Sequence, residues 1–548
     1  MEVPVHIGIK NTVLDSVLVI WPDNSYEKLQ PAAGTVTSVA YKNNLPLFNY
    51  ARLQKPFETT AGFSTNSSAG LNYLHTENDF VEFDREQLLP FMLSKEGPGV
   101  AVADINHDGL EDVFIGSSKT YKPAVFLQNS KGSFIKSLQP SLEADSMYEE
   151  VSACWADVNN DTHVDLITAS GGNEYYGKDE HMTPRLFLND GKGNLTFKQG
   201  AFNDVYLTAS IVTAQDINAD GKTDLFIGAR AVPWKYGELP HSYFLLNDGA
   251  GNFKDATASL CKEQEIHGFV KNAQWADLDK DGDTDLLLAL EWDGIVAYMN
   301  NKGKFTRKQL AAESGWWNFA TPVDIDNDGD LDIIAGNLGL NSRLQASNKQ
   351  PVHLYVNDFD GNGTKEQILT YFLNDRELPF ANKAELEKQL PVLKKKYLYA
   401  EEFAKASLKD MFGSDKLNAS ELLTANYFAN AVFVNDGKMN FKAVALPWQA
   451  QLSSLKDAAL INANNDALPD ILIAGNFYEN NIQMGRYDAS YGNVLINKGN
   501  AQFSCVPLKG LPVMGQVRHI QPIMVGGKQN WLLVRNNDSS LLIQQVHE

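Results

Sequence analysis

The hydrophobic and polar positions of this chain repeat as a unit from Gly99 onward. Each unit begins with a short apolar run and passes through an acidic nine-residue loop into a second apolar run. An aromatic-rich run, a tight turn and a final run follow. Several turns read Asn-Asp-Gly, at residues 189–191, 247–249 and 435–437, and such residues supply the positive φ angles of hairpins. Four short strands per unit, repeated along the chain, predict an all-β propeller.

Seven acidic loops mark the repeats, with Asp, Asn or Glu at positions 1, 3, 5 and 9. Position 2 is apolar in every loop, so each loop is expected to join two strands. The fourth loop, residues 277–285, is the most complete, because it has four aspartates and Gly282 at position 6. The seventh, residues 462–470, keeps only two carboxylates. In the first six loops the polar positions are Asp104, Asn106, Asp108 and Asp112; Asp157, Asn159, Asp161 and Asp165; Asp216, Asn218, Asp220 and Asp224; Asp277, Asp279, Asp281 and Asp285; Asp324, Asp326, Asp328 and Asp332; and Asp358, Asp360, Asn362 and Glu366.

This arrangement of oxygen atoms predicts structural calcium sites. Ca²⁺ takes six to eight oxygen ligands, whereas Mg²⁺ needs a tighter octahedron and retains its waters. Glycine at position 6 allows the positive φ that folds such a loop back on itself. An EF-hand would need a bidentate Glu at position 12, where the fourth loop has Leu288 inside an apolar run. We expect Ca²⁺ in about five or six loops, with weaker binding in the second, where Thr162 replaces glycine, and little or none in the seventh.

The number of blades depends on the sixth loop. Its first residue is Asp358, and the first residue of the fifth loop is Asp324. This sequence separation is shorter than that between any other two successive loops. If it lies in the outer hairpin of the fifth blade, and residues 517–546 form a closing unit, the propeller has seven blades. If it opens a blade of its own, there are eight. We expect seven, with a strand from residues 47–63 completing the last blade and removing an open sheet edge.

Residues 378–428 interrupt the β pattern. They are rich in Ala, Glu, Lys and Leu, and residues 384–390 and 399–408 have the periodicity of amphipathic helices. We therefore expect a helical insertion between blade strands. Its run of Lys394, Lys395 and Lys396 is interpreted as a solvated helix face, with contact to an anionic partner as the alternative.

Composition limits the class and location of the protein. A formal net charge of −21 disfavours a nucleic-acid partner, because phosphate would be repelled. Positions 1, 3, 5 and 9 of the loops hold 22 of the 68 acidic residues, so much of the acidity fits unfilled metal sites. Three cysteines without paired spacing imply no disulfide framework, and no stretch has the length of an apolar membrane span. Extracellular calcium sites bind at roughly 0.1–1 mM, which the cytosol cannot fill, so we expect a location outside the cytoplasm.

Known catalytic motifs are missing from the sequence, which contains no His-Glu-x-x-His, Gly-x-Ser-x-Gly or Cys-x-x-Cys. We therefore predict a monomeric, non-enzymatic propeller that binds a protein or glycan ligand. The alternative is a carbohydrate hydrolase or lyase, which carboxyl groups of raised pKa at the central channel would favour. His75 is expected on the surface or in a connector. Packing between blades is expected for four tryptophans near incoming strands, with a platform for stacking sugars as the alternative: Trp155, Trp275, Trp316 and Trp317.

Two stretches resemble known families. The loops, with phrases such as Gly-Val-Ala-Val-Ala-Asp at residues 99–104, resemble the FG-GAP/VCBS repeats of integrin α-subunit propellers. Residues 6–10 and 15–24 resemble the end of the ASPIC/UnbV domain, although Asn24 stands where that family usually has glycine. Together they make the chain similar to the cartilage-acidic-protein-like family. That resemblance implies a secreted or surface-exposed protein, outer-membrane-associated or periplasmic if bacterial, with an adhesive or ligand-binding role.

The same resemblance suggests the domain organisation. We expect residues 1–50 to be the end of an ASPIC/UnbV-like β module and residues 51–96 to be a connector that includes the ring-closing strand. Residues 97–548 are expected to form the propeller. Since residues 1–50 are too short to bury both faces of a sheet and show no signal peptide, we expect the chain to be the C-terminal portion of a longer protein.

Overall fold

The computed structural model describes residues 16–30, 34, 36–50, 62–262 and 266–546, and the chain divides into two compact units, 1–59 and 60–548. The first unit contains an antiparallel hairpin of β1 (Val17–Ile20) and β2 (Tyr26–Leu29). At its turn the Asp23 carboxylate accepts hydrogen bonds from Ser25 and Tyr41, and Asn24 has a φ of 65°. A non-glycine residue thus adopts the left-handed conformation. The other half of the predicted ASPIC/UnbV motif, residues 6–10, lies outside the described residues.

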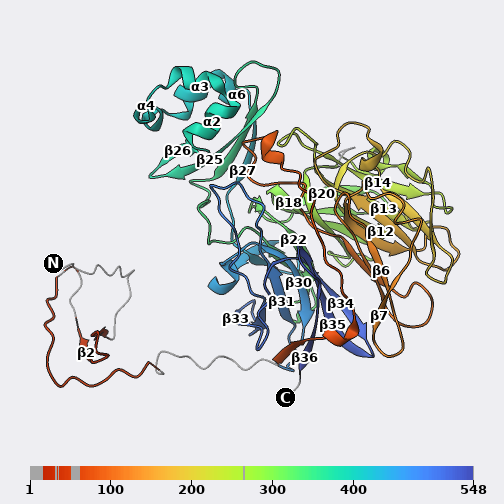
Figure 1. Ribbon diagram of the computed structural model, residues 1–548, viewed down its shortest axis with the longest axis horizontal. Helices are drawn as coiled ribbons and strands as arrows, with labels where there is room; N and C mark the ends of the chain where they lie inside the picture. Colours follow the sequence, from red (N-terminus) through yellow and green to blue (C-terminus); the bar gives the residue numbers. More distant parts are fainter. Residues whose placement is uncertain (1–15, 31–33, 35, 51–61, 263–265, 547–548) are drawn as a thin grey trace. The chain divides into compact units, whose positions relative to one another are not determined.

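Strands dominate the second unit, and within the described residues antiparallel sheets of four or five strands follow one another in a propeller-like arrangement (Figure 1). In chain order their strands are β4 (Val100–Ala103), β5 (Asp112–Ile115), β6 (Ala124–Gln128) and β7 (Phe134–Ser137); β8 (Glu150–Ala156), β9 (Asp165–Ser170), β10 (Arg185–Asn189) and β11 (Leu195–Phe197); β12 (Thr208–Gln215), β13 (Asp224–Ala231), β14 (His241–Asn247) and β15 (Phe253–Asp255); β17 (Phe269–Ala276), β18 (Asp285–Asp293), β19 (Ile295–Asn300) and β20 (Phe305–Gln309). The last three sheets contain β22 (Phe319–Val323), β23 (Asp332–Gly336), β28 (Ala431–Asn435) and β29 (Phe441–Ala445); β30 (Leu455–Ile461), β31 (Asp470–Gly475), β32 (Asn493–Asn497) and β33 (Phe503–Pro507); and β34 (Gln516–Val525), β35 (Lys528–Asn536), β36 (Leu541–Val546) and β3 (Gly62–Thr65). Short β16 (Ile266–His267) and β21 (Gly315–Trp316) pair with β14 and β18, and α1 (Thr257–Leu260) follows β15.

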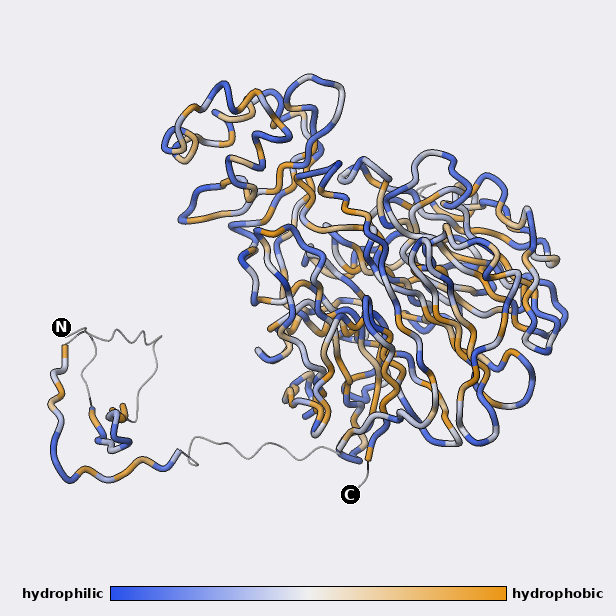
Figure 2. Tube along the Cα trace, viewed as in Figure 1, coloured by the Kyte–Doolittle hydropathy of each residue, from blue (hydrophilic) through white to orange (hydrophobic). Residues whose placement is uncertain are grey.

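The sheets pack face to face around a common axis. Each pair of neighbouring sheets shares a hydrophobic cluster, as where Phe114 of the first sheet packs with Leu166 of the second. Further clusters join each sheet to the next, and one joins Leu532 of the last sheet to Val113 of the first. The sheets therefore form a closed ring. Apolar residues follow the strands in Figure 2, because the second strand of each sheet is covered on both faces.

A strand from the N-terminal side completes the last sheet. β3 pairs antiparallel with β36, with Phe63 opposite Gln545. The expected stretch for this strand, residues 47–63, overlaps β3 only at Gly62 and Phe63. Pairing the two ends of the second unit in one sheet covers the edge of β36.

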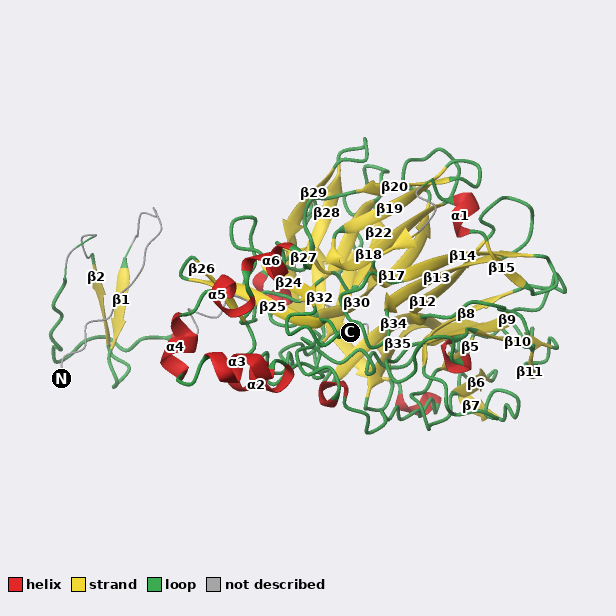
Figure 3. Cartoon of the chain, turned by 90° about the horizontal axis from the view of Figure 1, so that it is seen from above, coloured by secondary structure: helices red, strands yellow, loops and turns green. Residues whose placement is uncertain are grey.

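The insertion in the fifth sheet is larger than the helical segment predicted from the sequence. Between β23 and β28 lies an additional four-stranded sheet of β24 (Val352–Asn357), β25 (Glu366–Leu373), β26 (Arg376–Pro379) and β27 (Glu421–Ala425). Its helices are α2 (Lys383–Gln389), α3 (Pro391–Lys396), α4 (Ala400–Lys405), α5 (Leu408–Phe412) and α6 (Ser414–Asn418), which gather beside it in Figure 3. The sixth loop joins β24 to β25, so it lies neither in an outer hairpin of the fifth sheet nor in a further member of the ring. No helix in the described part of the chain is long and apolar enough to cross a membrane.

Residues 71–98, which we call the plug segment, run across one end of the ring before the first sheet begins. The segment is buried at Leu89 and at Leu93, which are 0% and 1% exposed. The Phe91 ring lies 5.4 Å from that of Trp316 and 5.8 Å from that of Phe477, measured between centroids. Because these aromatic partners come from different sheets, the segment ties several blades together at the axis.

Candidate metal centres

Six of the seven acidic loops occupy equivalent places, since each joins the first strand of a ring sheet to its second. The fourth loop, for example, connects β17 to β18 and the fifth connects β22 to β23. The first strand ends at the residue before position 1, and the buried second strand begins at position 9. The polar positions are therefore held at both ends by paired strands, at one end of the ring.

The backbone of these loops turns back on itself at two places. In the fourth loop Lys280 at position 4 has a φ of 63° and Gly282 at position 6 a φ of 93°. This turn directs the Gly282 N–H at the Asp277 carboxylate, 3.1 Å away. The same bond from position 6 to position 1 occurs in each of the first six loops, through Gly109, Thr162, Gly221, Gly282, Gly329 and Gly363. Thr162 adopts this conformation at a φ of 73°, which is costly for a β-branched residue.

Three loops bring carboxylate oxygens close enough to share an ion. Oxygen atoms of Asp277, Asp279 and Asp285 lie within 4.8 Å of one another, and the same holds for Asp324, Asp326 and Asp328 and for Asp358, Asp360 and Glu366. No other trio of acidic, histidine or cysteine side chains among the described residues meets this distance. In the first three loops an asparagine replaces the carboxylate at position 3. In the fourth and fifth loops Asp281 and Asp332 stand outside the trios.

Unpartnered oxygens in these loops fit a cation. Asp324 Oδ1, Asp326 Oδ1 and Glu366 Oε1 are buried and accept no hydrogen bond from the protein. Buried carboxylate oxygens without a partner cost free energy, and a hard divalent cation satisfies them directly. The residues present therefore suit calcium, with side-chain oxygens from positions 1, 3, 5 and 9 as the available ligands.

The carboxylate at position 9 also accepts backbone hydrogen bonds, a structural role that the sequence pattern did not predict. Asp285 Oδ2 accepts the Leu278 N–H at 3.0 Å, and its Oδ1 accepts the Asn300 N–H at 2.7 Å. One carboxylate thus joins position 2 of its own loop to the end of the third strand. The same pair of bonds is made by Asp112, Asp165, Asp224, Asp332 and Asp470.

Burial shifts the protonation of the position 9 carboxyls. It raises the pKa to about 6 for Asp112, Asp165, Asp224, Asp285 and Asp332, and to about 7 for Glu366. Backbone hydrogen bonds act in the opposite direction, and the neighbouring loop carboxylates add to the rise. A bound divalent cation would reverse the shift, because it favours the charged form.

An asparagine at the end of the third strand links neighbouring sheets. Asn247 Nδ2 donates to the Val158 carbonyl in the loop of the preceding sheet at 2.8 Å and to Thr223 in its own loop at 2.9 Å. Asn189 and Asn497 make equivalent bonds to Ile105 and Ile325. Two of the Asn-Asp-Gly turns visible in the sequence, those beginning at Asn189 and Asn247, therefore also link their sheet to the loop of the preceding one.

Of the other residues singled out in the sequence, His75, Trp316 and Trp317 are buried, whereas Trp155 and Trp275 are partly buried and pack against hydrophobic clusters. His75 is 2% exposed, and burial lowers its pKa to about 3. The prediction of a surface position is therefore wrong, although His75 does lie in the stretch expected to be a connector, residues 51–96. Trp316 and Trp317 are 5% and 0% exposed and pack in hydrophobic clusters.

The ring axis contains a cavity of about 220 Å³, lined by two carboxylates, Glu96 and Asp457. Burial raises the pKa of Asp457 to about 7. Its oxygens accept the N–H groups of Ile520 and Ala458, at 2.7 and 2.8 Å, so the side chain bonds two neighbouring sheets. Burial also acts to raise the pKa of Glu96, but Lys271 and Arg230 outweigh it and hold that pKa well below its ordinary value.

Comparison with known proteins gives a partial assignment. An FG-GAP-like repeat family matches residues 104–168, 157–227 and 277–335. Human integrin alpha-IIb is 26% identical over an alignment of 183 residues. The match covers 29% of this chain and 18% of the integrin, so it spans less than a fifth of that relative's length.

The solved structures that match this chain are distant from it. One described as YCF48 bound to D1 peptide has a TM-score of 0.39 at 9% identity, covering 87% of this chain and 98% of that one. The V. cholerae biofilm matrix protein Bap1 has a TM-score of 0.35 at 11% identity, covering 87% and 91%. Similarities this weak say nothing about function. The segments matched by the family contain the first five acidic loops, and this chain is therefore identified as one that carries FG-GAP-like repeats.

Proposed function

We propose that this chain is a calcium-stabilised, seven-bladed propeller that works outside the cytoplasm as a non-enzymatic binding module for a protein or glycan ligand. The observation that carries the calcium part is the buried, unpartnered oxygens of Asp324, Asp326 and Glu366 inside loops of the right oxygen spacing. The integrin similarity supports a protein ligand and a surface location, and the hairpin at Asp23 and Asn24 is compatible with an ASPIC/UnbV-like N-terminal module.

Calcium in this proposal stabilises the ring. Each loop joins only two strands of a small sheet, so an ion that binds the folded loop and not the unfolded chain raises stability by mass action. At roughly 1 mM Ca²⁺ and dissociation constants of roughly 0.1–1 mM, each site contributes about 0.4–1.4 kcal/mol. About five or six sites then add several kcal/mol, which the low free calcium of the cytosol would not supply.

Thermal unfolding in EGTA and in about 1 mM CaCl₂ tests the proposal. We expect a clearly higher midpoint with calcium, and an unchanged midpoint would refute calcium stabilisation. Asp279→Ala in the fourth loop should lower the measured number of bound ions by one. Asn464→Ala, at the same position of the seventh loop, is the matched control and should leave that number unchanged.

Carbohydrate hydrolysis is the second candidate, because the pKa of Asp457 is raised and the side chain lines the axial cavity. A general acid needs a free proton, however, and both Asp457 oxygens accept backbone hydrogen bonds. A glycan array combined with a hydrolysis assay separates the two functions. Retained glycan without cleavage supports the binding module, whereas cleavage that Asp457→Asn abolishes would replace it with the enzyme.

A further inference from the structure

Five of the seven first strands contain an irregularity near their start, at the end of the ring where the plug segment lies. The strand register shifts between Glu150 and Ser152, Ala209 and Ile211, Val270 and Asn272, Leu455 and Asp457, and Val517 and His519. Each shift leaves one residue without a partner across the sheet. A β-bulge of this kind changes the direction of a side chain and often occurs beside a binding site.

The residues at these bulges surround the ring axis. They are Val151, Ser210, Lys271, Lys456 and Arg518, and all five line the axial cavity of about 220 Å³. Three of the five are basic, in a chain whose formal net charge is −21. The positive charge is therefore concentrated on the axis of an otherwise acidic molecule.

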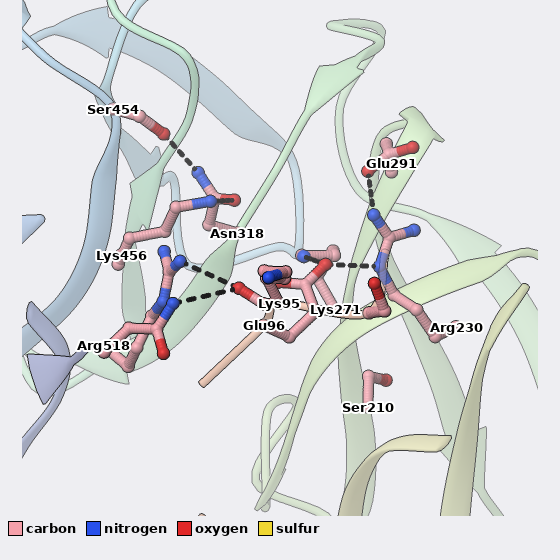
Figure 4. Close-up of polar contacts among 12 residues, drawn as sticks. Lys95, Glu96, Ser210, Arg230, Lys271, Glu291, Asn318, Ser454, Lys456 and Arg518 are labelled. Carbon is pink, nitrogen blue, oxygen red and sulfur yellow. Dashed lines mark hydrogen bonds and ion pairs between the residues drawn. The ribbon is translucent and has the colours of Figure 1, made fainter. Parts of the chain in front are cut away.

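Part of this charge is balanced by the plug segment. The Glu96 carboxylate lies 2.6 Å from Lys271 Nζ and 2.8 Å from Arg230 Nε, and Arg230 also pairs with Glu291 at 2.7 Å (Figure 4). The carboxylates of Glu96 and Glu291 thus form ion pairs with Arg230 and Lys271. These contacts explain why the plug segment stays across the ring.

The remaining two cations have no such partner. Lys456 Nζ donates to Asn318 Oδ1 at 2.8 Å, and Arg518 Nη2 donates to the Lys95 carbonyl at 3.1 Å. In the described part of the chain neither forms an ion pair with a carboxylate. Arg518 is 5% exposed and its Nε has no hydrogen-bond partner. The charges of Glu96, Glu77 and Glu479 act on Arg518, and that of Glu96 acts on Lys456, without a direct ion pair. A buried cation without a carboxylate in direct contact favours an anion from solution.

Both cations lie over the same aromatic ring. Lys456 Nζ is 4.2 Å and the Arg518 guanidinium carbon 4.9 Å from the centroid of Phe477. Burial lowers the pKa of Lys456 well below its ordinary value, and the nearby cations Lys271 and Arg518 add to the effect. A bound anion would relieve this repulsion between like charges.

We propose that the axial cavity binds a small organic anion through a carboxylate or phosphate group that contacts Lys456 and Arg518. An arginine provides a planar fork for such a group and a lysine a point charge, so the pair suits either chemistry. Gln274 and Gln521 lie further along the cavity wall and offer hydrogen bonds to the hydroxyl groups of the ligand. This inference goes beyond the proposed function, because the site is separate from the calcium loops.

Calorimetric titration with D-glucuronate and with glucose 6-phosphate tests the proposal, in 1 mM CaCl₂ and at constant ionic strength. Glucose is the neutral control. We expect saturable binding of at least one anion and none of glucose. Binding of D-glucuronate alone identifies a carboxylate site, and binding of glucose 6-phosphate alone a phosphate site. Failure of both anions would overturn the proposal and leave the calcium melts unaffected.

Two variants that should change the affinity for the anion in opposite directions test the location of the site. Lys456→Met should weaken anion binding by about tenfold or more, because a charged hydrogen bond is lost. It should also melt no lower than the native protein, since it removes a repelled charge. Lys442→Met, on the exposed face of β29, is the matched control and should bind as the native protein does. Glu96→Gln should tighten binding, because it removes the competing carboxylate. Unchanged affinity in both Lys456→Met and Glu96→Gln would overturn the assignment.

Discussion

The fourth and seventh acidic loops occupy the same place in their sheets but close in different ways. In the fourth, the Asp277 carboxylate accepts the Gly282 N–H at 3.1 Å, and Gly282 has a φ of 93°. In the seventh, Ala467 stands at the glycine position and is not in the left-handed region. Asn462 Nδ2 instead donates to the Asp466 carbonyl at 3.0 Å. At position 1 the seventh loop therefore has an amide that donates to its own loop, whereas the fourth has a carboxylate that only accepts.

Position 9 is the same in both loops. Asp470 accepts the N–H groups of Ala463 and Asn497 at 2.8 and 2.9 Å, as Asp285 does those of Leu278 and Asn300. The comparison separates two roles that the repeat combines. The carboxylate at position 9 holds three strands in register, whereas positions 1, 3, 5 and 6 prepare the loop for an ion.

The largest expected effect concerns the shared position. Asp285→Ala and Asp470→Ala should each lower the free energy of unfolding by about 2–6 kcal/mol, because each leaves two buried N–H groups without an acceptor. Urea unfolding in EGTA measures this loss without a contribution from calcium. In CaCl₂ the loss of unfolding free energy caused by Asp285→Ala should be larger than in EGTA. The loss caused by Asp470→Ala should be the same in both solutions. An Asp470→Ala variant with the same free energy of unfolding as the native protein would show that the position 9 carboxylate does not hold the strands in register.

A smaller effect is expected at position 6. Gly282→Ala should cost about 1–2 kcal/mol, since a non-glycine residue must adopt the left-handed conformation. An added Cβ meets no atom within 4 Å there, so the cost is purely conformational. Ala467→Gly should cost at most about 1 kcal/mol, through backbone entropy. Equal losses in the two variants, measured by urea unfolding, would contradict the difference in backbone conformation.

The smallest effect is a pH dependence of calcium binding. Burial raises the pKa of Asp285 from 3.8 to about 6, so without calcium this group makes the folded state bind more protons than the unfolded state between these values. Its contribution to stability therefore falls as pH rises from about 4 to about 6. Calcium needs the charged form, so affinity at the fourth loop should rise through the same range. We expect it to be about twofold weaker at pH 6 than at pH 8.

Calcium titrations at pH 5, 6 and 8 measure this dependence. Asp470→Asn is the control, because the seventh loop is expected to bind no ion. Its calcium-linked pH profile should match that of the native protein. A profile that is flat between pH 5 and pH 8 would mean that no position 9 carboxyl takes part in binding.

Much of the ring can be anticipated from local patterns. Strands on either side of each acidic loop, the Asn-Asp-Gly turns and the residues of the loops are all short-range features, and they repeat. The sixth loop shows the limit of such patterns. Its residues match those of the other acidic loops. The strand before it, β24, nevertheless pairs with β27, which follows the whole helical segment. Local periodicity does not say which sheet a strand joins. The residues at the axis were also missed, because Lys271, Lys456 and Arg518 share no sequence motif.

The sequence by itself determined the repeat, the positions of the acidic loops and the exceptional character of the seventh, because loop conformation depends on residues that are adjacent in the chain. Only the tertiary structure decided the closing of the ring by β3, the separate sheet of the insertion and the basic axis around Glu96. Those features depend on contacts between residues far apart in the chain, from Val352 with Ala425 to Gly62 with Val546. Burial, and the loss of solvation that comes with it, then decides which charges remain without a partner.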